Sequence, residues 1–564
     1  MAGETPDQIS SIFWDYMFVG GGLAASVVSH RLHQFDPSLK ILVVEAGPDA
    51  SNRSDIIWPN STNLIGGDFD WKDNSVNQLH LDGRSINLPN GKALGGGTVI
   101  NGGGWLRGDK YDYDLWGSLT NDARWSYDGQ LPYMRKTETF WNNTTNPDQH
   151  GHNGPVLIQS ATSTDRAFPL RDYALRSWAE VGIDPLLGLD ANAGNPLGVG
   201  ELNENKEEGR REIASSIYPL DGITVLTNTL VEKVLVEKTD HAEDGNGAVA
   251  VGIRLACNTE IRGREIIVAA GAVRTPQVLM LSGVGPAGEL TKHGIPTLVD
   301  HPDVGQNLAD HGLFFHAWKV KDPSAGWAVG SPNPLFSQPQ YGLGFPFDLI
   351  VSSDVRKEGL AAAIAEDEGA VPDPSSHPLL ADKRTFVEHV FMYAGAADGS
   401  LVTFGAIMLL PTARGSVKLA SADIREAPLI DPNFLGTAVD RYVAREAIKT
   451  QIKFAGSDAT VIGREILNGE AGAAGFDEVL STNSTDEYID ARIRAGFGTS
   501  FHPMGTAAMG KVVDSKLRVK GVRGLRVVDA SVFPVAITGH LQVATYALAE
   551  QAAEIIYADH TNSS

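Results

Sequence analysis

DYMFVGGGLAA, residues 15 to 25, decides the fold. Tyr16 to Val19 is an apolar run of strand length, three glycines follow it, and LAASVVSHRLHQF then has the apolar spacing of a helix packed on a sheet. The turn has the form G-x-G-x-x-A, in which small residues allow a tight turn and let a pyrophosphate approach the backbone. We therefore expect the turn and the start of the helix to bind phosphate, through Gly20, Gly22, Leu23 and Ala24.

A second apolar strand, KILVVEAG, ends at Glu45 and Ala46. An acidic residue at the tip of this strand is placed to accept hydrogen bonds from a ribose diol. A glutamate also suits an unphosphorylated ribose, which favours FAD or NAD over NADP. Strand, glycine turn, helix, strand and acid follow in the order of a dinucleotide-binding unit, and a purely structural turn is the alternative reading.

The composition excludes several classes of protein. A chain of 564 residues is expected to form two or more domains. Its formal net charge of −23 argues against nucleic acid or an anionic membrane as a partner. No apolar run is long enough to span a membrane. The single cysteine, Cys257, excludes an internal disulfide and a cysteine-built metal site, and we expect no metal.

Localisation has two opposing signals. The N-terminus, MAGETPDQIS, lacks the features of a signal peptide. Acceptor sequons for N-glycosylation stand at six positions, more than chance supplies, and favour a secreted glycoprotein: Asn52, Asn60, Asn142, Asn143, Asn483 and Asn562. Sequons that never meet the secretory pathway are the alternative.

A second glycine-rich segment, GKALGGGTVINGGGWLRG, spans residues 91 to 108 and mixes bare backbone with core-forming side chains. A nicotinamide enzyme has no need of it, but a flavin enzyme must wrap the rings of a fixed FAD. We expect Gly95, Gly96 and Thr98 to pass against the pyrophosphate and flavin. We expect Asn101 and the glycines that follow it, Gly102, Gly103 and Gly104, to lie along the edge of the isoalloxazine ring.

From these motifs the chain resembles the glucose–methanol–choline (GMC) flavoprotein oxidoreductases, and within them the fungal aryl-alcohol-oxidase-like members. The family's first signature is matched across residues 91 to 114 and its second by GAVRTPQVLMLSGVG, residues 271 to 285. Further matches are DVGQNLADH (303–311), APLIDPNFL (427–435) and SFHPMGTAAMG (500–510). The resemblance runs from about residue 13 to the end of the chain.

The resemblance implies an α/β fold: a Rossmann-like FAD-binding domain of the GMC type, plus a substrate-binding domain with an antiparallel sheet and helices. Residues 13–160, 215–311 and 500–564 are expected in the FAD-binding domain, and residues 161–214 and 312–499 in the substrate-binding domain. The cofactor contacts implied in the second half of the chain are Val231 near the adenine, Asp529 and Ala530 at the diphosphate and ribityl chain, and Leu541, Gln542 and Val543 at the final helix.

Local patterns predict four further elements. Leu230 to Ala256 has the pattern of a hairpin. PQVLMLSG looks like a helix with Pro276 in its first turn. The acid-rich segment GLAAAIAEDEGAVPDPSS is either a mobile rim or, as the plainer reading, a solvated helix. VATYALAEQAAEII, after the final loop, is expected to be a strongly amphipathic helix.

Two histidines carry the expected chemistry. Alcohol oxidation needs a base for the O–H proton while the C–H hydrogen leaves as hydride to flavin N5, and histidine suits that task near neutral pH. In the family the first position is histidine and the second histidine or asparagine, here His502 and His540. We expect His502, stiffened by Pro503, to be the base and His540 to orient the substrate oxygen. Without a flavin beside them, two histidines that merely pack a loop would be the plainer reading.

The expected reaction is oxidation of an alcohol to the aldehyde. Phe501 and Trp105 are predicted in the substrate pocket, and Phe501 with the small glycine floor favours a primary alcohol on an aromatic or conjugated carbon. Some relatives attach FAD through a histidine where this chain has Ile100, so FAD is expected to be noncovalent. Oxygen or a quinone would reoxidise it. The alternatives are a lyase or cyclase that keeps FAD only as structure, and a noncatalytic flavin-binding protein.

Overall fold

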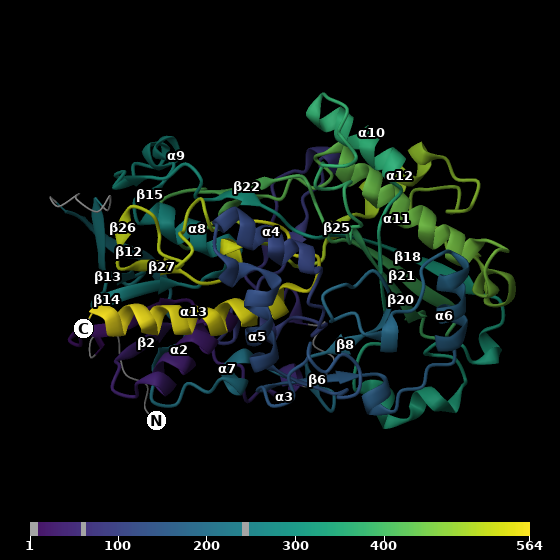
Figure 1. Ribbon diagram of the computed structural model, residues 1–564, viewed down its shortest axis with the longest axis horizontal. Helices are drawn as coiled ribbons and strands as arrows, with labels where there is room; N and C mark the ends of the chain where they lie inside the picture. The colour runs from purple at the N-terminus through teal and green to yellow at the C-terminus, as the bar shows by residue number, and fades with distance from the viewer. Residues whose placement is uncertain (1–8, 58–63, 240–246, 564) are drawn as a thin grey trace.

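The computed structural model describes residues 9–57, 64–239 and 247–563. Two large sheets lie next to each other along the longest axis (Figure 1), and each has its own hydrophobic cluster. The mixed α/β class with a Rossmann-like FAD-binding part, expected from the sequence, is confirmed. The exact domain boundaries stay a prediction.

The first sheet has the order β11-β2-β1-β14-β13-β12. Pairing of β1 with β2 and with β14, and of β2 with β11, is parallel, as a dinucleotide-binding unit requires. Two late strands, β26 and β27, add to β13 and β14. The bounds are Trp14–Val19 (β1), Ile41–Val44 (β2), Thr224–Leu226 (β11), Val231–Lys238 (β12), Ala248–Leu255 (β13), Glu260–Val268 (β14), Val522–Arg523 (β26) and Leu525–Val527 (β27).

The second sheet is antiparallel throughout, with the order β24-β18-β21-β20-β19-β7 and β25 beside β18. This sheet turns one face toward the central cavity described below. Its bounds are Gly198–Glu201 (β7), Gly312–Val320 (β18), Leu349–Ser353 (β19), Val387–Gly395 (β20), Leu401–Met408 (β21), Leu467–Glu470 (β24) and Gly498–Thr499 (β25).

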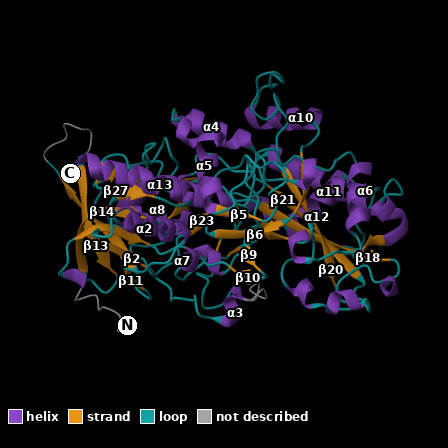
Figure 2. Cartoon of the chain, turned by 60° about the horizontal axis from the view of Figure 1, so that its bottom comes forward, coloured by secondary structure: helices purple, strands orange, loops and turns teal. Residues whose placement is uncertain are grey.

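Helices cover both sheets (Figure 2). Those of the first half of the chain are Leu23–Phe35 (α2), Ser54–Ile57 (α3), Lys110–Thr120 (α4), Tyr127–Thr137 (α5), Arg171–Glu180 (α6), Ala214–Ile217 (α7) and Gly271–Leu281 (α8). Those of the second half are Ala287–Lys292 (α9), Lys357–Glu368 (α10), Ala438–Gly456 (α11), Asp486–Gly496 (α12) and Leu541–Ser563 (α13).

The remaining strands are short and lie outside the two large sheets. They form the pairs β3 with β4, β9 with β10 and β15 with β16, and the three-stranded sheets β5-β6-β8 and β17-β22-β23. Their bounds are Asp73–Asn74 (β3), Asn87–Leu88 (β4), Glu138–Phe140 (β5), Val156–Ser160 (β6), Asn203–Glu204 (β8), Lys206–Glu207 (β9), Arg210–Arg211 (β10), Val284–Gly285 (β15), Val299–Asp300 (β16), Gln306–Leu308 (β17), Gly415–Lys418 (β22) and Leu429–Asp431 (β23).

The two glycine segments touch through their backbones. Gly96 begins a short 3₁₀ helix, Gly96–Val99, and a Cβ built on it would lie 2.8 Å from the Cα of Gly22, with φ at +56°. Gly95 N donates to Gly21 O at 2.8 Å. Because no side chain fits between these backbones, the second segment lies directly beside the N-terminus of α2.

The final helix, α13, differs from the sequence prediction. It begins at Leu541 and its first four turns are buried on nearly every side, so the expected strong amphipathicity is wrong. The reason is that α13 packs between α2 and α5 and on the first sheet. Its buried Glu550 is compensated by Arg31 of α2, which donates from Nη2 at 2.7 Å, and by the Tyr218 hydroxyl at 2.9 Å.

Helix α8 also begins earlier than predicted, at Gly271 rather than at Pro276, which lies inside it. A proline there cannot donate to the carbonyl of Ala272, four residues before. The hydroxyl of Thr506 donates to that carbonyl at 2.6 Å instead. The helix can therefore continue through the proline because a distant loop satisfies the released acceptor.

The remaining local predictions agree with the structure. Strands β12 and β13 pair antiparallel as the predicted hairpin, whose turn lies outside the described residues. The first part of the acid-rich segment, up to Glu368, lies in α10, which packs on α11 and ends at Gly369 in the left-handed conformation; the rest of the segment follows as a loop. Four sequon asparagines, Asn52, Asn143, Asn483 and Asn562, are exposed, Asn142 is partly buried and Asn60 is outside the described residues. Secretion stays a prediction.

None of the described helices has both the length and the apolar character needed to cross a membrane.

The contact between Gly96 and Gly22 predicts a contrast between two neighbouring glycines. Gly96→Ala should destabilise the cofactor-free protein by more than the roughly 1–3 kcal/mol that a side chain at positive φ costs, because its Cβ also meets backbone. Gly97→Ala is the matched control, since a Cβ there meets no atom within 4 Å in the described structure. Urea unfolding of both variants measures the difference, and equal stabilities would contradict the packing argument.

Candidate active site

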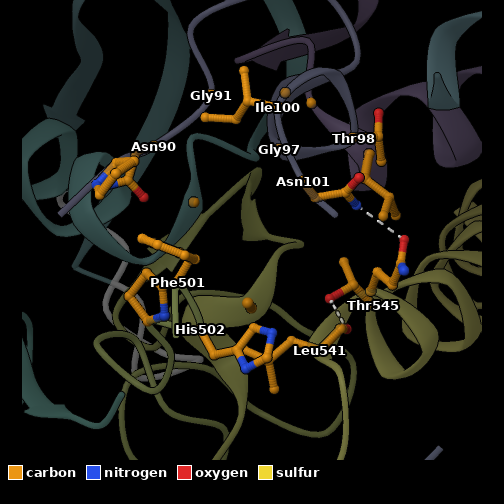
Figure 3. Close-up of a pocket in the computed structure, with 18 of the residues that line it drawn as sticks. Asn90, Gly91, Gly97, Thr98, Ile100, Asn101, Phe501, His502, Leu541 and Thr545 are labelled. Atoms are coloured by element: carbon orange, nitrogen blue, oxygen red, sulfur yellow. Dashed lines mark hydrogen bonds between the residues drawn. The ribbon is translucent and has the colours of Figure 1, made fainter. Parts of the chain in front are cut away.

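One cavity of about 660 Å³ lies where the two sheets meet. It is lined by both glycine segments, by the ends of β1, β2 and β14, by the start of α13 and by the inner face of the second sheet. In Figure 3, Asn90 and Phe501 stand on one side of it and Thr98, Asn101 and Thr545 on the other. The cavity thus joins segments that are far apart in the sequence.

Most residues predicted at the site line this cavity. They are the phosphate-loop residues Gly20, Gly22, Leu23 and Ala24; Glu45 and Ala46; Gly96, Thr98, Asn101, Gly102, Gly103 and Gly104; Val231; Asp529 and Ala530; Leu541 and Gln542; and Phe501, His502 and His540.

Three predicted residues lie elsewhere. A Cβ on Gly95 would lie 2.5 Å from Ile213 Cγ2, so this glycine faces the protein and not the cavity. Val543, in the first turn of α13, is buried in the core. Trp105 is also in the core, and its indole N–H donates to Glu138 at 3.0 Å. The prediction that Trp105 lines the substrate pocket is therefore wrong, because the buried Glu138 and the Tyr546 ring hold the indole in the core.

The carboxylate of Glu45 links the glycine turn after β1 to the residues that follow β2. One carboxylate oxygen accepts from Gly21 N at 2.8 Å and the other from Gly47 N at 2.7 Å. Burial raises the pKa of this carboxyl to about 6, although both amides oppose the shift. Each oxygen keeps a second lone pair, so the carboxylate can bind the glycine loop and accept from a ribose hydroxyl at once.

Asp529, at the end of β27, binds the start of α8. It accepts from Gly271 N at 2.9 Å and from the Thr275 hydroxyl at 2.6 Å, while its other oxygen accepts from Ser531 N at 2.8 Å. Burial raises the pKa of Asp529 above its usual value. These contacts hold the carboxyl end of β27 against the cavity.

Side-chain amides hold the second glycine segment against α13. Asn101 Nδ2 donates to Gln542 Oε1 at 3.2 Å, a contact drawn in Figure 3, and Gln542 Nε2 donates to the carbonyl of Gly104. Arg211 donates to Asn101 Oδ1 at 2.7 Å. The backbone from Asn101 to Gly104 is thus fixed at both ends by hydrogen bonds.

The structure brings the two predicted histidines together although 38 positions separate them in the sequence. The rings of His502 and His540 have centroids 5.6 Å apart and are tilted by 37°. A Cβ on Gly104 would lie 2.6 Å from the His540 ring, which explains why the floor beneath it is glycine. Both rings border the same cavity.

His540 is paired with a carboxylate that the sequence did not single out. Its Nε2 lies 3.1 Å and 3.3 Å from the two oxygens of Glu388, on β20. Burial alone would lower the pKa of His540, but the charge of Glu388 and its hydrogen bond raise it above the usual value. No sequence signal marks Glu388, because only the folded second sheet brings it to the cavity.

His502 has the opposite environment. Its Nδ1 lies 3.0 Å from Nδ1 of His311 and 3.2 Å from Oγ of Ser500. Burial, together with the nearby His311 and His540, lowers the pKa of His502 well below its usual value. His311 was missed, although it ends the family motif DVGQNLADH and could have been found there.

One wall of the cavity is apolar. Side chains from the second sheet and from the loop before β19 form this wall: Leu313, Phe315, Phe345, Phe347, Val390, Met392 and Ile407. A Cβ on Gly102 would lie 2.6 Å from the Phe345 ring, so the glycine floor and the aromatic wall are in contact. Such a surface binds an apolar group by burial rather than by hydrogen bonds.

The cavity fits FAD by its shape and its donors. Among the described residues no side chain caps the N-terminus of α2 and its first turn holds no acid, which leaves backbone N–H groups for a pyrophosphate. Bare glycine backbone follows from Gly20 to Gly22 and again from Gly102 to Gly104. For metals the described residues offer no cluster of three or more suitable side chains.

Comparisons with known proteins identify related sequences and folds. Two family models, both described as GMC oxidoreductase, match residues 14–313 and 411–549. The GMC-type oxidoreductase acuG of Aspergillus aculeatus is 34% identical over 556 residues, covering 97% of this chain and 99% of that protein. The alcohol dehydrogenase (acceptor) of Pseudomonas putida is 32% identical over 564 residues, covering 96% and 95%.

Among solved structures, a formate oxidase of Aspergillus oryzae RIB40, studied for its FAD modification, has a TM-score of 0.85. It is 26% identical and the match covers 98% of this chain and 99% of that chain.

The contacts of Glu45 predict how the site responds to Glu45→Gln. A glutamine has one acceptor oxygen, so either Gly21 N or Gly47 N would face an NH₂ group and lose its partner, at a cost of about 1–3 kcal/mol. FAD affinity should fall with the fold intact. The measurement is the dissociation constant for FAD by fluorescence quenching, with circular dichroism as a check of the fold.

The same carboxyl predicts a pH dependence of FAD binding. With a pKa of about 6, Glu45 is charged at pH 7 and protonated at pH 5, so its acceptance from the ribose should weaken as the pH falls through 6. Glu45→Gln should lose this dependence. An FAD affinity that is the same at both pH values in the wild-type protein would mean that Glu45 does not contact the ribose.

Proposed function

Because the chain belongs to the GMC oxidoreductase family, we propose that it oxidises a primary alcohol to the aldehyde with FAD as its cofactor. The family makes it an FAD-dependent oxidoreductase. One observation carries the finer proposal: two histidines border one cavity, and their surroundings displace their pKa values in opposite directions. Opposite displacement is how a single site supplies both a base and a cationic group near neutral pH.

The phosphate loop, Glu45, the glycines of the second segment and Asp529 would hold FAD. When bound, FAD supplies an acceptor for the hydride that leaves the alcohol carbon. The protein residues provide the cavity, the orientation of the alcohol and the movement of the hydroxyl proton.

His502 is the proposed base. Because its pKa lies well below 6.5, its ring is neutral at neutral pH and has a lone pair for the alcohol proton. Transfer of that proton leaves negative charge on the substrate oxygen and a positive charge on His502. Burial disfavours this charge, and the nearby Ser500 and His311 are the groups that can accept a hydrogen bond from the charged ring.

His540 is the proposed orienting group. Its pairing with Glu388 raises the pKa of His540 and so favours the charged ring. A positive charge within a few ångströms of the developing alkoxide stabilises it in a cavity of low dielectric. Glu388 thus acts on the substrate through His540.

The apolar wall supports an aromatic or conjugated alcohol. A sugar needs hydrogen-bonding side chains around its hydroxyl groups, whereas the second sheet presents phenylalanine, valine, methionine and isoleucine. The Pseudomonas relative is by name an alcohol dehydrogenase, which agrees with an alcohol substrate. Reoxidation by oxygen or by a quinone would complete the cycle.

The alternative is a lyase or cyclase that keeps FAD as structure. It predicts no bleaching of the flavin when candidate alcohols are mixed with the protein without oxygen. The proposed oxidation predicts bleaching with aromatic primary alcohols and little with sugars, and a noncatalytic flavin-binding protein would bleach with neither.

Variants of the two histidines test their roles. His502→Ala removes the proton acceptor and should slow anaerobic flavin reduction by about 100- to 10,000-fold, with FAD still bound. His540→Asn keeps a hydrogen-bonding group beside Glu388 and should have a smaller effect. Stopped-flow reduction with one good alcohol measures both, and a larger loss in His540→Asn would reverse the assignment.

The pKa directions also set the pH profile of flavin reduction. The rate should need His502 neutral and His540 charged, so it falls in acid below the low pKa of His502 and in alkali above the raised pKa of His540. Glu388→Gln removes the charge that raises the second pKa and should move the alkaline limb to lower pH. An alkaline limb that stays in place would separate Glu388 from the role of His540.

Ile100 predicts noncovalent FAD. It lines the cavity next to Asn101, and an aliphatic side chain cannot form the histidyl bond used by some relatives. Denaturation with acid should therefore release yellow flavin into the supernatant. Flavin that stays with the precipitated protein would show a covalent bond at some other residue.

A further inference from the structure

The segment that carries His502 is bound to Asp310 and His311, the two residues before β18. Asp310 Oδ1 accepts from His502 N at 2.9 Å, and its Oδ2 accepts from the Thr499 hydroxyl at 2.6 Å. Ser500 N donates to His311 O at 2.8 Å. The backbone of His502 is therefore held from the same element that supplies His311.

The hydrogen bonds around Nδ1 of His502 restrict where its proton can be. The Ser500 hydroxyl has one hydrogen, and it donates to the His311 carbonyl at 3.0 Å. Toward Nδ1 of His502, at 3.2 Å, the same oxygen can then only accept. An acceptor at this position is satisfied only if Nδ1 of His502 carries a hydrogen.

The His311 side chain leads to the same tautomer. Its Nδ1 lies 3.0 Å from Nδ1 of His502, and the two rings are nearly perpendicular, at 88°. One of the two atoms must donate and the other accept. If His502 donates, both contacts of its Nδ1 are satisfied, and if His311 donates, the lone pairs of His502 Nδ1 and Ser500 Oγ face each other.

His311 is suited to the accepting role. Its side chain is fully buried, and burial lowers its pKa to about 3, so it stays neutral. With Nδ1 as the acceptor, its own hydrogen lies on Nε2. That atom has no hydrogen-bond partner of good geometry among the described residues, but the backbone carbonyl of Leu409 is near enough to raise the ring's pKa, as an acceptor would.

We propose that Ser500 and His311 hold His502 in the tautomer protonated at Nδ1, so that Nε2 is the atom that takes the alcohol proton. Both are positioning residues, because they act through His502. The identity of the proton donor rests on the proposed alcohol oxidation, whereas the tautomer belongs to the resting protein and does not. The other ring nitrogen's hydrogen bond commonly sets the reactive nitrogen of a histidine.

The proton balance is simple. The O–H bond of the substrate breaks and an N–H bond forms at Nε2, so that His502 becomes an imidazolium with hydrogens on both nitrogens. Its Nδ1–H still donates to the neutral His311 and Ser500, whose acceptor atoms stabilise the new positive charge. With the other tautomer, Nε2 would already carry a hydrogen, and the only lone pair would face away toward His311.

Magic-angle-spinning ¹⁵N NMR of the FAD-loaded protein, labelled with ¹⁵N-histidine, tests the tautomer without any substrate. Subtracting the spectrum of His502→Gln isolates the signals of His502. We expect a protonated Nδ1 and an unprotonated Nε2 at pH 7. An unprotonated Nδ1 would overturn the proposal whatever the enzyme oxidises.

Two variants test the positioning residues. His311→Leu and Ser500→Ala each remove an acceptor from Nδ1 and should increase the Nε2-protonated form, slowing flavin reduction by about 10- to 100-fold. His311→Asn can place an amide oxygen near the position of Nδ1 and should restore most of the rate. Unchanged tautomer signals in both folded variants would contradict the proposal.

His316→Leu is the matched control for packing. His316 is buried on β18 and its Nε2 bonds Gln451 at 2.7 Å, away from His502. It should lower thermal stability as His311→Leu does, but leave the His502 signals and the reduction rate unchanged. If His311→Leu does not fold, Ser500→Ala alone decides, and loss of rate in the control equal to that in Ser500→Ala would indicate a packing effect.

If no alcohol bleaches the flavin while the NMR shows Nδ1–H on His502, the proposed oxidation is wrong and the tautomer stands. If alcohols bleach the flavin while Nδ1 is unprotonated, the tautomer is wrong and the oxidation stands.

Discussion

The close approach of two glycine backbones is the constraint on which the site depends. Gly22 at the start of α2 and Gly96 in the second segment leave no room between them for a side chain. The second segment can lie against the first only if Gly96 is glycine, since its Cβ would lie 2.8 Å from the Cα of Gly22. From there the chain continues to Asn101 and Gly104 beneath the histidines.

The second glycine-rich segment has a large entropic cost of folding. Glycine loses much conformational freedom on folding. Here that cost is offset by side chains on either side, since Leu94 and Val99 are buried and the Thr98 hydroxyl accepts from Ala214 N at 3.0 Å. Apolar residues anchor the segment, and bare backbone is left facing the cavity.

The sequence could predict features that depend on local spacing. The strand, glycine turn and helix around Gly20 are local, and the family motifs placed His502 and His540 correctly beside one cavity. The sequence could not predict Glu388, which lies near the start of β20 and reaches His540 only through the packing of the second sheet. It also could not show that Trp105 turns inward to Glu138, because an indole after a glycine run suits a pocket and a core equally well.

The predictions for helices α8 and α13 were wrong for a related reason. Pro276 predicts a helix start because proline cannot donate within a helix, and the rule holds unless another group satisfies the released carbonyl. Thr506, more than two hundred positions away, does so for Ala272. The periodicity of α13 suggested one apolar face, whereas packing between α2 and α5 buries its polar residues as well, including Glu550.

The two histidines differ because His540 is paired with a carboxylate and His502 is not. Both rings are largely withdrawn from water, which by itself would keep both neutral. Glu388, from the second sheet, changes this for His540, while His311 and Ser500 offer His502 no charge at all. A chain with the first sheet alone would have two neutral histidines and no cation beside the substrate oxygen. The division of roles within the pair therefore comes from the second sheet, through one carboxylate.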